Sequence, residues 1–258
     1  MSADVTIPTV LLNNGQKIPI LGFGTSHATE EAVREALADG YRHFDTSHSY
    51  VDASGKVSME TIIGKVLKDV LKEGHIKRED LFIVSKLEPE DHERKSVSVA
   101  IKASLANLGL DYLDMFLVHQ PGSTKPVNVS IAETWLGMND VLQAKLTKSI
   151  GVSNFAESQL DQLKGKGVVP VTNQCVSNPY ETQTKLLSYL RAHNITLTAY
   201  CPLGGYTDPD LLKDGKLKEI GVSHNVSAAQ VALRYQVQRG VITIPKSNTA
   251  KYIKENLE

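Results

Sequence analysis

The chain has 258 residues, of which 41% are hydrophobic and 22% are charged. This length suits a single barrel domain of about 250 residues, and we expect one domain to cover residues 1–258. The 28 Lys and Arg residues nearly balance the 29 Asp and Glu residues, which argues against nucleic acid or an anionic membrane as a partner.

Targeting and metal-binding signals are also missing from the sequence. No run reaches the ~18 apolar residues of a membrane span, and the N-terminus lacks the basic-then-apolar order of a signal peptide. The 2 cysteines, Cys175 and Cys201, are too few for a disulfide framework and lack the spacing of zinc ligands. We therefore expect a cytoplasmic protein that holds no metal.

Turn residues and apolar stretches alternate along the first half of the chain. Residues 6–19 place Asn-Asn-Gly between two apolar stretches, which predicts a β-hairpin. Thr29 is placed to cap a helix that ends at Gly40, and Gly74 and Gly109 end two further amphipathic stretches. After the hairpin, the predicted elements are strands at 20–24, 41–47, 81–86 and 115–119, and helices at 30–39, 57–73 and 97–108.

The same alternation continues through the second half. Ser227 and Gln230 form a possible capping box that opens a helix. The predicted elements are strands at 148–152, 168–175, 196–200 and 241–244, and helices from about 131, at 156–163, at 184–193 and from 228. A short eighth helix follows the last strand. Repeated strand–helix pairs predict an α/β fold, a single (β/α)8 TIM barrel with an N-terminal β-hairpin.

Four polar side chains, Asp45, Tyr50, Lys86 and His119, stand at or just past the carboxyl ends of predicted strands. In a parallel barrel these ends meet at one face, where barrel enzymes carry their active sites. An ammonium beside a phenol favours the phenolate and lowers the phenol pKa, a carboxylate keeps the ammonium charged, and an imidazole orients the reacting oxygen. The set predicts a site that protonates a developing alkoxide.

Each of these residues has an ordinary explanation when it is taken alone. A strand-end lysine such as Lys86 is commonly a solvated charge, and a histidine after an apolar run, such as His119, is usually a core residue. Asp45 and Tyr50 could serve only to cap and pack a loop. Their occurrence together on successive strand ends favours the functional interpretation.

Short motifs throughout the chain resemble those of the aldo-keto reductase family. In chain order they are GFGT at 22–25, FDTSHSY ending in Tyr50, SKL around Lys86, the strand ending in His119, IGVSNF at 150–155, TNQ at 172–174, AYCPLG at 199–204 and IPKS at 244–247. The resemblance runs from the hairpin to Asn256. It implies NADPH-dependent reduction of an aldehyde or ketone by direct hydride transfer. In that scheme Tyr50 donates the proton, His119 binds the carbonyl oxygen, and Lys86 with Asp45 tunes the tyrosine.

The resemblance also implies a cofactor site, which the chemistry of the residues supports. Amide and hydroxyl side chains suit a nicotinamide carboxamide, an aromatic ring can stack on the nicotinamide, and barrels commonly bind phosphate after the last strand. The predicted cofactor contacts are Thr25, Asp45, Ser153, Asn154, Gln174, Tyr200, Leu203, Lys246, Ser247, Asn248, Thr249, Glu255 and Asn256, the last six toward the 2′-phosphate and adenine. Cys175 and Cys201 either lie close to the nicotinamide or are two buried, inert thiols.

The predicted substrate site departs from the family pattern at three positions. Ser26, Glu88 and Gln120 stand where well-known members carry tryptophans, which predicts a polar substrate pocket unless these side chains turn outward into solvent. Tyr252 stands where the family usually has an arginine. We therefore expect NADPH to be the preferred cofactor and NADH to serve as a poorer one.

The segments that cover the substrate in this family are short in the present chain. The sequence ends at Glu258, soon after the start of the predicted eighth helix, and the connections after His119 and Gly204 are short. We expect short or truncated substrate loops and an open mouth to the barrel.

Two other functions are compatible with a barrel of this kind. One is a non-catalytic binding protein that keeps a nucleotide as a sensor, although the complete set of four proton-transfer residues argues against it. The other is a Schiff-base aldolase with Lys86 as the nucleophile, which leaves Ser153, Asn154 and Gln174 without a role. We expect a monomer that acts on a small carbonyl compound and has no nucleic-acid or membrane partner.

Overall fold

A β-hairpin precedes the barrel in the computed structural model, which describes residues 7–122 and 129–258. Strand β1 (Thr9–Leu11) pairs antiparallel with β2 (Lys17–Pro19). Gly15 lies in the turn with a φ of +85°, a left-handed value that glycine adopts without a steric penalty. The hairpin predicted at 6–19 is confirmed from residue 7 onward, and residue 6 lies outside the described residues.

Across the described residues the main sheet has eight parallel strands whose spatial order follows the chain. These strands are β3 (Phe23–Gly24), β4 (His43–Asp45), β5 (Phe82–Leu87), β6 (Met115–Val118), β7 (Ile150–Ser153), β8 (Thr172–Val176), β9 (Thr196–Tyr200) and β10 (Ile242–Thr243). A parallel bridge between Leu21 and Thr243 joins the two edges. The N–H of Thr243 donates to Ile20 O at 2.8 Å, and the N–H of Gly22 donates to Thr243 O at 2.9 Å. The sheet therefore closes into the predicted barrel.

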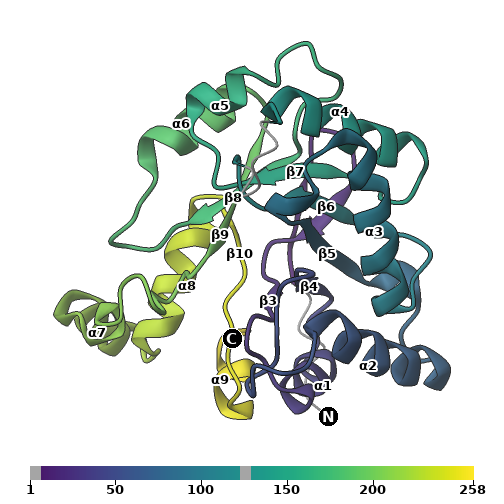
Figure 1. Ribbon diagram of the computed structural model, residues 1–258. Coiled ribbons are helices and arrows are strands. Elements are labelled where there is room, and N and C mark those ends of the chain that lie inside the picture. The colour runs from purple at the N-terminus through teal and green to yellow at the C-terminus, as the bar shows by residue number, and fades with distance from the viewer. Residues whose placement is uncertain (1–6, 123–128) are drawn as a thin grey trace.

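Helices cover the outside of the sheet (Figure 1). They are α1 (Glu30–Asp39), α2 (Met59–Glu73), α3 (Arg94–Leu108), α4 (Ile131–Gln143), α5 (Glu157–Asp161), α6 (Thr184–Ala192), α7 (Gly215–His224), α8 (Ala228–Gln238) and α9 (Ala250–Glu255), with short 3₁₀ turns at Arg78–Asp80, Pro89–Asp91 and Leu211–Lys213. Thr29 accepts a hydrogen bond from the N–H of Ala32, and Ser227 and Gln230 cap α8 reciprocally. Both predicted N-caps are thus confirmed.

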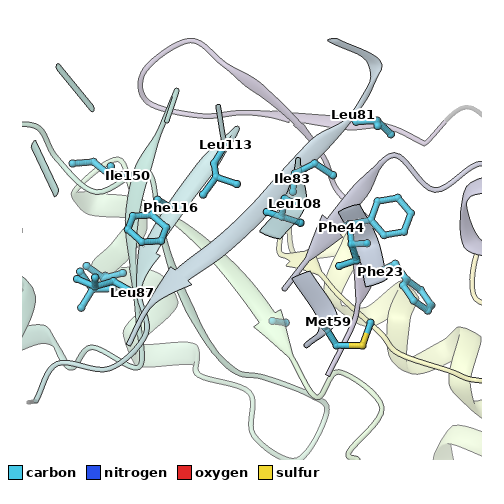
Figure 2. Close-up of a cluster of buried hydrophobic side chains, with 14 of the residues drawn as sticks. Phe23, Phe44, Met59, Leu81, Ile83, Leu87, Leu108, Leu113, Phe116 and Ile150 are labelled. Atoms are coloured by element: carbon cyan, nitrogen blue, oxygen red, sulfur yellow. The ribbon is translucent and has the colours of Figure 1, made fainter. Parts of the chain in front are cut away.

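Alternate residues of β5 and β6 enter two different parts of the core. Ile83 on β5 and Phe116 on β6 face the helices and belong to the larger cluster, part of which is drawn in Figure 2. Their neighbours Val84 and Leu117 point into the barrel, as the two-residue period of a strand requires. Leu12 and Ile18 of the hairpin pack onto this inner cluster. The hairpin therefore plugs the amino-terminal end of the barrel and does not cover the carboxyl ends of the strands.

The structure differs from the sequence-based expectation in the second half of the chain. Helix α7 was not predicted, because Leu217 and Gly221 are its only buried residues and such a narrow apolar stripe gives little periodic signal. The strand predicted from residue 168 begins at Thr172, since Val168 and Val169 are 45% and 51% exposed. Within the described ranges, no helix has the length and apolar character needed to cross a membrane.

Candidate active site

A cavity of about 520 Å³ lies at the carboxyl ends of the barrel strands, a volume within the ~300–1,000 Å³ typical of small-molecule sites. Predicted catalytic, cofactor and substrate residues share its wall. Those that line it are Thr25, Ser26, Asp45, Tyr50, His119, Gln120, Ser153, Asn154, Gln174, Tyr200, Leu203 and Lys246. The convergence expected from parallel strand ends is therefore present.

A buried ion pair between Lys86 and Asp45 lies next to the ring of Tyr50. Lys86 Nζ lies 2.5 Å from Asp45 Oδ1 and donates a second hydrogen bond to Thr46 O at 2.8 Å. Only 1% of Lys86 and 2% of Asp45 is exposed, so both charges are satisfied inside the protein, as burial demands. The ammonium of Lys86 is 4.7 Å from the centre of the Tyr50 ring. Lys86 thus acts on the cavity through Asp45 and Tyr50.

The pKa of Tyr50 differs from the sequence-based expectation. Burial raises the pKa of Tyr50 above its ordinary value, and the positive charge of Lys86 opposes this rise without cancelling it. Burial would by itself lower the pKa of Lys86, but the charges of Asp45 and Tyr50 more than reverse that effect and leave the pKa raised. The expected lowering of the tyrosine pKa is therefore corrected. In this structure Tyr50 is a protonated phenol beside a firmly charged ammonium.

His119 stands beside Tyr50 and is held from two sides. The centres of the two rings are 5.8 Å apart in an edge-to-face arrangement. The side-chain amide of Asn154 donates to the backbone oxygen of His119 at 3.0 Å. In the ring itself, Nδ1 lies 3.0 Å from both carboxylate oxygens of Glu88. Glu88 was expected on the substrate wall, but its carboxylate lies behind His119, and among the described residues it is not part of the cavity lining.

Hydrogen bonds join the predicted nicotinamide-binding residues to one another and to the catalytic residue Asp45. Ser153 Oγ donates to Gln174 O at 2.8 Å, and Gln174 Nε2 donates to Asp45 Oδ2 at 2.7 Å. Tyr200 OH donates to Asn154 Oδ1 at 2.9 Å. Asn154 itself has a left-handed φ of +64°, a conformation that asparagine tolerates better than most residues. The ends of three consecutive strands, β7, β8 and β9, are linked in this way to one another and to the end of β4.

The predicted phosphate and adenine residues lie beyond the cavity wall, apart from Lys246. They are Ser247, Asn248, Thr249, Glu255 and Asn256, and none of them lines the cavity in the described structure. Asn248 bridges to the first barrel unit, since its amide donates to His27 O at 3.0 Å and accepts from the N–H of Thr29 at 3.1 Å. Their predicted role in cofactor binding stays a prediction.

Among the cavity residues that were not assigned to the site, His27 and Tyr206 carry side chains of functional interest, and the cavity also includes Cys201, one of the two thiols considered for a place near the nicotinamide. His27 lines the cavity next to Ser26, Cys201 follows Tyr200, and Tyr206 stands at the mouth with 80% of its surface exposed. Cys201 has a φ of +49°, which no residue pattern encodes. Tyr206 belongs to no predicted element, and the only signal for it was an aromatic side chain in a glycine-containing loop after β9. Cys175 is buried and does not line the cavity among the described residues.

The chain is similar in sequence to several known proteins. Residues 21–258 match the model of the Aldo/keto reductase family. The chain is 38% identical over 282 residues to prostaglandin F synthase 1 of Bos taurus, covering 96% of this chain and 85% of the relative. It is 35% identical over 294 residues to an NADH-dependent D-xylose reductase of Candida parapsilosis, covering 100% and 89%.

A solved structure shows the same relationship in three dimensions. The crystal structure of a Bombyx mori aldo-keto reductase in complex with NADP superposes with a TM-score of 0.89 at 35% identity, covering 98% of this chain and 88% of the other. The match extends over the hairpin, the barrel and the cavity-forming strand ends. With this agreement of sequence and fold, the chain belongs to the aldo/keto reductase family.

Proposed function

We propose that this protein uses NADPH to reduce small polar aldehydes or ketones to alcohols, with Tyr50 as the proton donor. One observation carries the proposal: Tyr50 and His119 meet on the wall of a single cavity, above the buried pair of Lys86 and Asp45. Lys86 is itself 1% exposed and bonded to Asp45 and Thr46. This burial counts against the alternative in which Lys86 attacks a carbonyl as an aldolase nucleophile.

The donor set on the cavity wall suits a nicotinamide cofactor. Gln174 and Asn154 offer amide groups, Ser153 offers a hydroxyl, and Tyr200 offers an aromatic ring, all on one wall. A carboxamide needs such a mixture of donors and acceptors, and its ring needs a flat apolar surface. A related structure contains NADP, which supports the same assignment. Lys246 at the rim would serve the phosphates, and NADPH would supply the hydride that adds to the carbonyl carbon.

Side chains of the protein carry out the proton transfer to the substrate. Tyr50 O–H donates its proton to the carbonyl oxygen as that oxygen gains negative charge, and the resulting phenolate lies beside the Lys86 ammonium, which stabilises it. Asp45 keeps Lys86 charged throughout. His119 orients the oxygen from the other side. The phenolate recovers a proton from solvent through the open cavity, so the tyrosine returns to its starting state with each turnover.

Three broader expectations accompany this function. We propose a single domain over residues 1–258, a monomer, and a cytoplasmic location. The closed hydrogen bonding of the eight-stranded sheet supports the monomer, since within the described residues this sheet offers no open edge to a partner.

The first prediction concerns the proton donor. Tyr50→Phe removes the hydroxyl and keeps the ring, so we expect turnover to fall by about 10²–10⁴-fold while NADPH binding stays nearly unchanged. Steady-state reduction of an aldehyde and titration of NADPH fluorescence measure the two effects. Tyr235→Phe, on α8 and outside the cavity, is the matched control. Retention of more than a tenth of the wild-type rate, where chemistry limits turnover, would contradict the assignment.

The second prediction concerns the choice of cofactor. Tyr252 on α9 is 52% exposed and offers no charge to a 2′-phosphate. We expect wild type to prefer NADPH over NADH modestly, and Tyr252→Arg to increase that preference by about 1.5–3 kcal/mol, or roughly tenfold or more in kcat/KM. Tyr252→Phe keeps the ring and controls for packing. Equal use of both cofactors by wild type, or a preference for NADH, would refute the expected direction.

The third prediction concerns the substrate. Ser26 and Gln120 line the cavity with a hydroxyl and an amide, which favour hydrated or hydroxylated substrates over apolar ones. Short hydroxylated aldehydes should therefore be reduced well, and steroid ketones poorly. Ser26→Trp and Gln120→Trp should each improve kcat/KM for the steroid, because ~25 cal/mol is gained per Å² of apolar burial. Gln162→Trp, on an exposed surface, is the control. Low-micromolar KM for a steroid in wild type, without activity on short polar aldehydes, would refute the idea.

The fourth prediction concerns the two thiols. Cys201 lines the cavity, whereas Cys175 is buried with its pKa raised by that burial to about 11. Iodoacetamide should modify Cys201 first, and bound NADPH should slow the reaction because it fills the same cavity. Peptide mass spectrometry after timed labelling measures both sites, and Cys201→Ser identifies the reactive one. Equal labelling rates with and without NADPH would show that Cys201 lies away from the cofactor.

A further inference from the structure

The carboxylate of Glu88 sits in a polar pocket behind His119. Glu88 follows β5 directly and is 7% exposed. One of its oxygens accepts hydrogen bonds from the hydroxyl of Ser47 and, at 2.8 Å, from the hydroxyl of Ser49. The same oxygen lies 3.3 Å from the N–H of Ser49. A substrate-wall residue would keep its charged end free for ligand, whereas here three donors from the loop after β4 hold it in place.

These donors also keep the carboxylate ionised. Burial alone would raise the pKa of Glu88, but His119 and the two serine hydroxyls outweigh burial and lower the pKa to about 2. An ionised carboxylate can only accept hydrogen bonds. The nitrogen that faces it at 3.0 Å, Nδ1 of His119, must therefore carry a proton. The arrangement leaves one orientation and one tautomer for a neutral imidazole ring.

We propose that Glu88 is a positioning residue for His119: with Ser47 and Ser49 it holds a proton on Nδ1, so that Nε2 is the nitrogen that meets the substrate. This inference rests on the proposed reductase function and deepens it. In the neutral ring, Nε2 has a lone pair and accepts a hydrogen bond, for example from a substrate hydroxyl. When the ring takes up a second proton, it does so at Nε2, and His119 can then donate to the carbonyl oxygen.

The other groups around the ring fit this division of roles. Tyr50 presents its ring edge-to-face to His119, and the hydrogen bond from Asn154 reaches the backbone oxygen of His119 and not its ring. Ser47 Oγ lies 3.4 Å from Nδ1 on the Glu88 side. Lys86 and Asp45 form an ion pair with each other. Glu88 is therefore the group that decides which nitrogen of His119 is protonated.

Nitrogen-15 NMR of the histidine side chains tests the tautomer directly. Protein labelled with [15N]histidine is studied with NADP+ bound, at a pH above the histidine titration, and His119→Asn identifies the signals of His119 among the 8 histidines. Wild type should show a protonated Nδ1 and an unprotonated Nε2. Glu88→Ala should shift the ring toward the Nε2–H form, and Glu88→Gln, which keeps the size of the side chain, should give a mixture. The exposed Glu90→Gln is the matched control and should leave the signals of His119 unchanged.

Kinetics separate positioning from direct contact with substrate. Loss of the partner that orients a functional histidine costs about tenfold or more in metal sites. We expect a similar loss in kcat for Glu88→Ala, because the ring loses the contact that fixes its orientation, with the Kd for NADPH unchanged. A rise in KM for polar substrates, at constant kcat and with an unchanged tautomer, would instead make Glu88 a substrate contact and overturn the proposal. An Nε2–H tautomer in wild type would overturn it as well.

The two readouts also distinguish this inference from the proposed function. If wild type reduced no carbonyl compound while His119 showed the expected tautomer and the expected response to Glu88→Ala, the reductase function would fail and the positioning of His119 by Glu88 would stand. If turnover were normal and the tautomer did not depend on Glu88, the positioning would fail alone.

Discussion

The carboxylate of Asp45 is the point on which the site depends. One oxygen accepts from Lys86 and the other from Gln174, while the backbone oxygen of the same residue accepts from Thr25. Four strands, β3, β4, β5 and β8, are linked through this single residue. Loss of Lys86 would leave the buried carboxylate with an uncompensated charge, and loss of Gln174 would leave one of its oxygens without this hydrogen bond, so the geometry of catalysis and the stability of the strand ends are one constraint.

The same pair sets the electrostatics that Tyr50 experiences. Burial favours the neutral phenol, and Lys86 favours the phenolate. The balance leaves a tyrosine that holds its proton at rest and is stabilised once it has given the proton away. An exposed tyrosine would also hold its proton at neutral pH, because its ordinary pKa is about 10, but a buried tyrosine without Lys86 would lack the stabilisation of its phenolate. The catalytic value of the site therefore lies in the ammonium of Lys86 beside the buried Tyr50 ring.

Sequence reasoning found the parts of the site that follow from strand periodicity. Asp45, Lys86 and His119 could be placed because parallel strand ends must meet at one face, and the hairpin and helix caps follow from local turn chemistry. The direction of the Tyr50 pKa shift could not be predicted from the sequence, because the burial of the ring depends on how loops fold over the site. Glu88 was misplaced for a related reason: just past a strand end the two-residue period stops, so the direction of a side chain is no longer encoded. Helix α7 was not predicted, because it buries too few residues to produce a periodic apolar pattern.

The hairpin plug described above has a consequence for how such a protein can change over time. Leu12 and Ile18 close one end of the barrel with apolar packing, and the chemistry occupies the other end. Mutations that alter the loops at the carboxyl ends act on ligand choice without loosening the plug, and the inner cluster can be repacked without moving Tyr50. Mutations can therefore change substrate specificity separately from stability, so the same fold can acquire new substrates and remain folded.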